Sequence, residues 1–190
     1  MTIKKFIARL NWRLAAVHYV AAWFFMYSFQ TLSALHNTAL LNIITKQGSH
    51  DIEPILSRHG IAAAELTDFV LWTSLANTAG LLVAFCISLV ISTRRKWFWF
   101  NSLLVLVLAI ILARLDQLAW QYLKRILLMP GKICSSAAME FLVNGLIMLA
   151  LGLLIFFWPK ANRFIEKGSN KNTASESGHE MNSCTSKISQ

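Results

Sequence analysis

Charged side chains are scarce in this sequence of 190 residues. They make up 14% of the chain, while 56% is hydrophobic and the mean hydropathy is +0.51; soluble domains are about one quarter charged. Three prolines, three cysteines and eight glycines are too few for a collagen-like fibre or a disulfide-rich secreted scaffold. The same composition disfavours a soluble two-domain enzyme and a disordered regulator. It is typical of a protein that lies in lipid.

Acidic residues are fewer than basic ones, nine against eighteen, and the formal charge is +9. Proteins that bind nucleic acid also carry such an excess. Here, however, the basic residues stand at the borders of apolar runs and form no basic motif. The sequence therefore predicts no nucleic-acid partner and favours anionic lipid headgroups as the partner of these cations.

Long uncharged runs account for most of the chain. A helix needs about 20 mostly apolar residues to cross the hydrocarbon of a bilayer. Four runs qualify; the third is short and its helix is expected to continue past Arg114, and Pro159 ends the fourth. The runs are residues 14–35, 69–92, 97–114 and 137–158. The predicted fold is an all-α polytopic membrane protein in which four transmembrane helices pack as a bundle.

Lysine and arginine are concentrated before the first run, between the second and third, and after the fourth. Because basic segments stay cytoplasmic, both termini are predicted to be cytoplasmic. The remaining segments are a basic N-terminus (1–13), an outer loop with short helices (36–67), a basic cytoplasmic loop (93–96), an interfacial amphipathic segment (115–136) and a cytoplasmic tail (159–190), disordered from about 168. A compact chain without an N-x-S/T sequon favours the bacterial inner membrane. A cleaved signal peptide is the alternative for the first run, but the run is longer than a signal core.

The cysteines and histidines do not predict a cofactor. Cys86, Cys134 and Cys184 fall in a span, an outer segment and the tail, so no internal disulfide is expected. His18 and His36 lie about 27 Å apart along one helix, and the other three spans contain no histidine. A bis-histidine haem would need its second ligand from another subunit.

Two stripes of small residues predict helix-contact faces, because small residues let helices approach closely in lipid. On the second span they recur at intervals of three and four, and on the fourth at intervals of seven. The residues are Thr73, Asn77, Gly80, Ala84 and Ser88 on the second span, and Ala138, Gly145 and Gly152 on the fourth.

Polar residues cluster at similar depths near the outer side. Glu140 and Asn144 share a helix face, Asn77 lies at the same depth, and Arg114 and Asp116 are within reach of an ion pair. One interpretation is an outward-facing pocket for a small ligand or cation. The other interpretation is structural: ion pairs and amide hydrogen bonds among these residues close the outer end of an ordinary helix bundle. The position of Glu140 near the membrane interface favours this second interpretation.

A second polar contact is conceivable near the cytoplasmic side. His18 and Asn101 share a depth there and could hydrogen-bond if the first and third helices touch. Gln30 lies elsewhere on the first helix and needs a neighbouring helix or a second protein to satisfy it.

Three functions compete at this stage. The packing stripes favour a non-catalytic accessory, assembly or regulatory subunit that packs against copies of itself or a membrane-protein partner. A small transporter or channel component would use the pocket around Glu140, although no span is broken by proline or carries a central charge. A membrane enzyme or haem-binding subunit comes last, because the sequence has no recognisable nucleophile with its base and no phosphate-binding loop.

Overall fold

The computed structural model of the chain describes residues 10–47, 58, 60–127 and 130–166, and describes only the backbone of residues 47, 113–125 and 127. The described residues form helices and short connections with no β-strand, so the all-α prediction is confirmed for them. In chain order the elements are α2 (Trp12–Ser33), the 3-10 turn η1 (Ala34–Asn37), α3 (Thr38–Gln47), α5 (Ala63–Arg94), α6 (Phe100–Leu127), the 3-10 turn η2 (Pro130–Ile133) and α7 (Ala137–Phe157). Residues 159–166 form one further helix.

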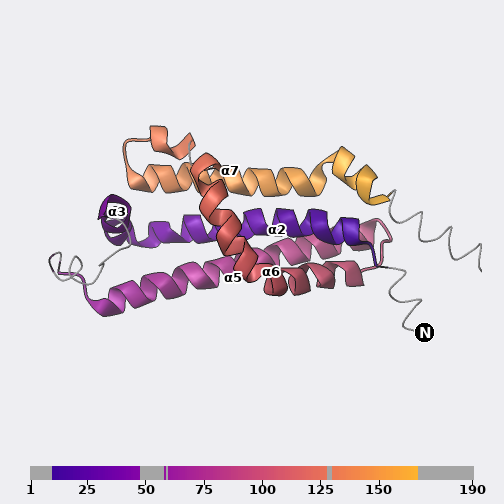
Figure 1. The fold of residues 1–190 in the computed structure, drawn as a ribbon, viewed down its shortest axis with the longest axis horizontal. Helices are drawn as coiled ribbons and strands as arrows, with labels where there is room; N and C mark the ends of the chain where they lie inside the picture. The colour runs from indigo at the N-terminus through magenta and orange to yellow at the C-terminus, as the bar shows by residue number, and fades with distance from the viewer. Residues whose placement is uncertain (1–9, 48–57, 59, 128–129, 167–190) are drawn as a thin grey trace, which may run out of the picture.

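Helices α2, α5 and α7 run side by side along the long axis of the molecule, with α2 between the other two (Figure 1). The first part of α6 packs on α2 and α5, and its later part runs obliquely across the molecule in this view. Helix α3 and the turns η1 and η2 pack against α7, at the end of the molecule where α7 begins (Figure 1). Helix α2 is therefore the element that α5, α6 and α7 all contact.

Local sequence explains where these helices begin and end. The Asn11 side chain accepts hydrogen bonds from the backbone N–H groups of Arg13 and Leu14, and so caps α2. Ser136 caps α7 in the same way. Helix α5 ends where Lys96 adopts a left-handed conformation with φ of 54°, a geometry that cannot continue a right-handed helix.

Two of the helices, α5 and α7, are long and apolar enough to cross a membrane. The prediction of four spans is thus supported for two of them. In the described part of α6 the apolar stretch is Phe100–Leu112, which is short for a crossing. Helix α2 is long enough, but its histidine, glutamine, tyrosine, serine and threonine residues lower its hydropathy.

Several boundaries differ from those expected. Helix α5 begins at Ala63, six residues before the predicted span, directly after Ala62, whose backbone is extended. Helix α6 continues past Arg114 to Leu127, as the sequence predicted, but it begins at Phe100, three residues after the start of the third run. Part of the predicted tail, residues 159–166, is helical, and Ile165 is fully buried. The rest of the predicted tail, 167–190, lies outside the described residues. Residues 48–57 and 59 of the predicted outer loop, 36–67, lie outside them as well.

The centre of the fold is the contact of α2 with α5 and α7 at Phe25. A Cβ atom added to Gly80 would lie 2.7 Å from the Phe25 carbonyl oxygen, and one added to Gly152 would lie 2.7 Å from the Phe25 ring. The absence of these two side chains lets both helices approach α2 closely. At this level the core consists of Ala21, Ala22, Phe25, Ala84, Ile91, Val105 and Phe156.

The outer faces of the same helices remain apolar and uncovered. Only 22% of the most apolar stretch of α5 is buried within the molecule. The exposed side chains on α5 and α7 include Val70, Leu71, Leu75, Leu82, Val90, Leu142, Leu146, Leu153, Leu154 and Phe157. A continuous apolar surface of this kind is the surface that lipid or another membrane protein covers.

We expect Gly80→Leu to lower the midpoint of thermal unfolding in detergent. Its side chain would meet the backbone of α2, which cannot move aside as a flexible side chain can, and overpacking a core costs about 1–3 kcal/mol. Ala79→Leu, at an exposed position on the same helix, is the control and should unfold as the wild type does. Equal midpoints for the two variants would contradict the close contact.

Candidate functional site

One end of the molecule carries six of the twelve basic residues in the described part of the chain. The start of α2, the end of α5, the start of α6 and the helix 159–166 meet there (Figure 1). We call this the basic end; its charged residues are Arg13, Arg94, Arg95, Lys96, Lys160, Arg163 and Glu166. Arg95 donates to Glu166 over 2.7 Å, with both side chains partly exposed. Arg13 lies over the Phe164 ring, 4.7 Å from its centroid.

A buried hydrogen-bonded chain of side chains lies just inside the basic end. His18 is fully buried, and its Nδ1 lies 2.7 Å from the Ser88 hydroxyl. Ser88 donates to Ser102 over 3.0 Å, and Ser102 lies 3.0 Å from the Ser92 hydroxyl. A hydroxyl has one proton to give, so Ser88 accepts from His18 Nδ1. This chain joins α2, α5 and α6.

The second part of this polar interior is built on Asn11. Its backbone N–H donates to Asn101 Oδ1 over 2.8 Å, and its side-chain Nδ2 donates to the Ile165 carbonyl over 2.9 Å. Asn11 and Asn101 are 6% and 2% exposed. One asparagine therefore caps α2 and ties it both to α6 and to the helix after α7.

The structure does not bring His18 and Asn101 into the direct hydrogen bond that the sequence suggested. Both lie in the buried polar interior, but His18 bonds to Ser88 and Asn101 bonds to Asn11. The Nε2 atom of His18 has no hydrogen-bond partner among the residues that the structure describes, and the ring packs edge-on against Phe156 with centroids 5.0 Å apart.

His18 and Ser88 resemble a base and a nucleophile in residue type, but their arrangement does not suit catalysis. A general base must accept the proton of the hydroxyl that it activates, whereas Ser88 gives its proton to Ser102. His18, Ser88 and Ser102 are all 0% exposed, so a substrate has no route to them. The chain of bonds holds helices together. No three metal-ligating side chains come together within the described ranges.

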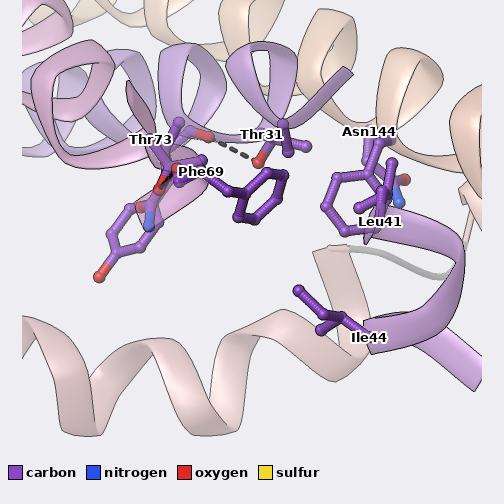
Figure 2. A pocket seen from close by; sticks show the side chains of 10 residues that line it. Thr31, Leu41, Ile44, Phe69, Thr73 and Asn144 are labelled. Carbon is purple, nitrogen blue, oxygen red and sulfur yellow. Dashed lines mark hydrogen bonds between the residues drawn. The ribbon is translucent and has the colours of Figure 1, made fainter. Parts of the chain in front are cut away.

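A cavity of about 270 Å³ lies at the opposite end, which we call the α3 end. Helices α2, α5 and α7 form its walls and α3 closes it (Figure 2). Figure 2 shows Ile44 of α3 facing the cavity from the side opposite Thr73. The lining residues are Tyr27, Gln30, Thr31, Ala34, Leu41, Ile44, Phe69, Thr73, Phe141 and Asn144.

The polar groups of this cavity are mostly engaged. Thr31 and Thr73 donate to carbonyls of their own helices, at Tyr27 and Phe69. Asn144 is 1% exposed and its Oδ1 accepts from the Gly131 N–H over 3.0 Å. The Gln30 carboxamide, by contrast, makes no hydrogen bond to any residue in the described part of the chain. The cavity thus offers an apolar interior with one available amide.

Only one member of the predicted outer pocket lines this cavity, namely Asn144. Glu140 stands half-buried in the first turn of α7, outside the lining. Asn77 lies one turn along α5 from Thr73, and its buried Oδ1 has no hydrogen-bond partner among the described residues. The side chains of Arg114 and Asp116 lie outside the described part of the structure. Gln30, Thr31 and Thr73, which the sequence did not assign to the pocket, line the cavity.

The small residues of the two stripes lie at helix contacts of different kinds. Gly80 and Gly152 face Phe25, and a Cβ on Gly145 would lie 2.6 Å from Leu32. The Gly145 carbonyl also accepts a 2.8 Å hydrogen bond from Ser28. Ala84 and Ser88 are buried, Ala138 is half-buried, and Thr73 lines the cavity.

Sequence reasoning missed four residues of the buried polar interior: Asn11, Ser92, Ser102 and Asn162. Two signals were available. Asn11 is a favoured helix cap just before an apolar run, and Ser92 follows Ser88 by four residues on the same helix face.

A packed apolar layer separates the polar interior of the basic end from the cavity of the α3 end. It is the layer around Phe25, where Ala21, Ala84 and Phe156 meet in the core. Comparison with known proteins adds no information about these features: no protein-family model, no curated protein and no solved structure matches the chain.

We expect Asn101→Leu to destabilise the folded protein. Leucine fills nearly the same volume but leaves the buried Asn11 N–H without its acceptor, which costs about 1–3 kcal/mol. Unfolding in detergent, followed by circular dichroism, measures the difference. Thr93→Ala is the control, because Thr93 is exposed and bonds only within its own helix. An Asn101 variant as stable as the control would show that this bond contributes nothing.

Proposed function

We propose that the chain is a multi-pass protein of the bacterial inner membrane that crosses the bilayer four times as a helix bundle. The starting point is that α5 and α7 point the same way. Their C-terminal ends are adjacent, since Arg95 pairs with Glu166 and Ile91 and Phe156 belong to one core cluster. Two spans with the same direction require that the chain between them return across the membrane, and α6 is the helix between them.

The same reasoning supports a crossing by α2. Its first residues bond to Asn101 and Ile165 at the basic end, and Ala34, which follows its last residue, packs with Phe69 at the α3 end. A helix held at both ends of two membrane spans extends across the same thickness. Its polar side chains face its neighbours, so low hydropathy does not prevent burial.

The charge distribution supports an orientation. Basic residues near span ends favour the cytoplasmic side, and they are concentrated at the basic end. Both termini then lie in the cytoplasm, and the cavity of the α3 end faces outward. The absence of an N-x-S/T sequon from the sequence favours a bacterial membrane over a eukaryotic one.

Within that architecture, we propose a non-catalytic accessory, assembly or regulatory subunit that acts through helix packing. The observation that carries this is the closed layer around Phe25. Two glycine contacts and the apolar core side chains fill the middle of the described part of the molecule, and we infer that they separate the two polar regions.

The surface that a partner helix would use lies on α5. An open groove of about 580 Å³ runs along its exposed face, where Ser74 and Thr78 interrupt a surface of leucine and valine. Small residues at intervals of four allow close helix contact in lipid. A transmembrane helix of another protein or of a second copy fits this face.

A ligand-binding or transport subunit is the second candidate, because the outward cavity contains the available Gln30 amide. Its occupant would be an uncharged molecule with an apolar body and one hydrogen-bonding group. Glu140 does not line this cavity, so the proposed site centres on Gln30 and Asn144.

Labelling of introduced cysteines tests the topology. In a variant with Cys86, Cys134 and Cys184 replaced by serine, we expect Ser135→Cys to react with a membrane-impermeant maleimide in intact cells. Lys160→Cys should react only after the cells are opened, because it lies at the opposite end. Both positions are exposed. Labelling of both cysteines in intact cells would rule out this arrangement.

Native mass spectrometry of the tagged protein, extracted from its own membrane in mild detergent, tests the proposed function. We expect a complex with a second polypeptide or a second copy in fixed ratio. Ser74→Phe should reduce that complex at least tenfold by blocking the groove, and Leu82→Phe, on an exposed part of α5 outside the groove, should not. A monomer in every sample would favour the ligand-binding candidate instead.

A further inference from the structure

A second groove lies between α5 and α7 at the basic end, and the proposed functions do not use it. Its volume is about 410 Å³. Side chains on two adjacent rows of the α5 surface form one wall of the groove. The end of α7 and the helix 159–166 form the other wall. The lining residues are Cys86, Ile87, Val90, Ile91, Arg94, Arg95, Phe156, Phe157 and Asn162.

Along most of its length this groove is apolar and open to the outside. Val90 is 50% exposed and Phe157 is 62% exposed, so both side chains form an accessible apolar wall. From Cys86 to Arg94 the groove extends about 12 Å along α5, at 1.5 Å per residue. The walls suit a hydrocarbon chain that lies parallel to the helices.

The end of the groove has the opposite character. Arg94, the last residue of α5, and Arg95, its C-cap, stand there. They belong to the basic end, whose one acidic member among the described residues is Glu166. Glu166 pairs with Arg95. Arg94 has no ion-pair partner among the described residues, so its guanidinium is available to an anion.

Asn162 adds an independent sign of a missing partner. It lines the same end of the groove, is 6% exposed, and its buried Oδ1 has no hydrogen bond within the described part of the chain. An unsatisfied buried oxygen costs free energy, and a headgroup hydroxyl seated beside Arg94 would supply the missing donor after a small rotation of the amide.

We propose that this groove binds one anionic phospholipid. Arg94 pairs with the phosphate, Asn162 accepts from a headgroup hydroxyl, and an acyl chain lies along Val90 and Phe157. The charge of the basic end selects an anionic lipid over a zwitterionic one. The inference rests on the proposed membrane crossing, since it requires that the apolar part of the groove face the hydrocarbon and its basic end face the headgroups.

Native mass spectrometry of the full-length protein in detergent, with added dioleoyl phosphatidylglycerol or dioleoyl phosphatidylcholine, tests the proposal. We expect one phosphatidylglycerol to be retained about fivefold more tightly than phosphatidylcholine, the effect of a single basic residue at an anionic lipid surface. Arg94→Gln should abolish that preference and Arg94→Lys should keep most of it. Val90→Trp should weaken the retention of both lipids by filling the groove.

Arg58→Gln is the matched control, because Arg58 is an exposed arginine outside this groove; it should retain the lipid preference of the wild type. Equal retention of the two lipids by the wild type would overturn the proposal, as would the same loss in the Arg58 and Arg94 variants. The maleimide labelling pattern is read separately in cells. A failure of the lipid site therefore leaves the topology result intact, and a failure of the topology is visible even where the lipid binds.

Discussion

The structure depends on how closely α5 and α7 approach α2 at the level of Phe25. Helices in lipid gain no hydrophobic free energy from contact with one another, so packing and hydrogen bonds must hold them together. At Gly80 and Gly152 the missing side chains bring both neighbours against Phe25. This proximity also aligns Ser28 with the Gly145 carbonyl and His18 with Ser88, which form hydrogen bonds on either side of the contact. The buried polar interior therefore lies on one side of this contact and the cavity on the other.

The distribution of polar groups divides the molecule into two ends with different properties. At the basic end most of the buried polar side chains bond to one another and connect four helical segments. At the α3 end they surround a cavity and leave one amide available. The packed layer between them keeps these regions independent. The groups that can interact with other molecules therefore lie at the ends and the outer surface of the molecule, and not along its centre. This distribution agrees better with a role in binding partners and lipid than with movement of a solute through the centre.

Composition and hydropathy predict the helical class and the two most apolar helices, because both depend only on local sequence. They do not establish the crossings of α2 and α6: α2 is polar where it faces other helices, and the described apolar stretch of α6 is short. The site was harder to predict. Depth along a helix places Glu140 and Asn77 near Asn144, but it does not give the rotation of each helix about its axis. The cavity is therefore lined by Gln30, Thr31 and Thr73, and not by Glu140 or Asn77. Asn11, the cap of α2, lies in the segment that the sequence predicts as a basic N-terminus. Its hydrogen-bond partners are 90 and 154 residues away along the chain, so local sequence does not predict these bonds.

The position of α2 has a consequence for the order of assembly in the cell. This helix is synthesised first among the proposed spans, yet the groups that satisfy its interior belong to helices made later: Ser88 on α5, Asn101 on α6 and the Gly145 carbonyl on α7. A nascent chain that has released only α2 exposes His18 and Ser28 to lipid without acceptors. Under the proposed topology, the hydrogen bonds of the first helix are therefore completed only when the last helix has been inserted.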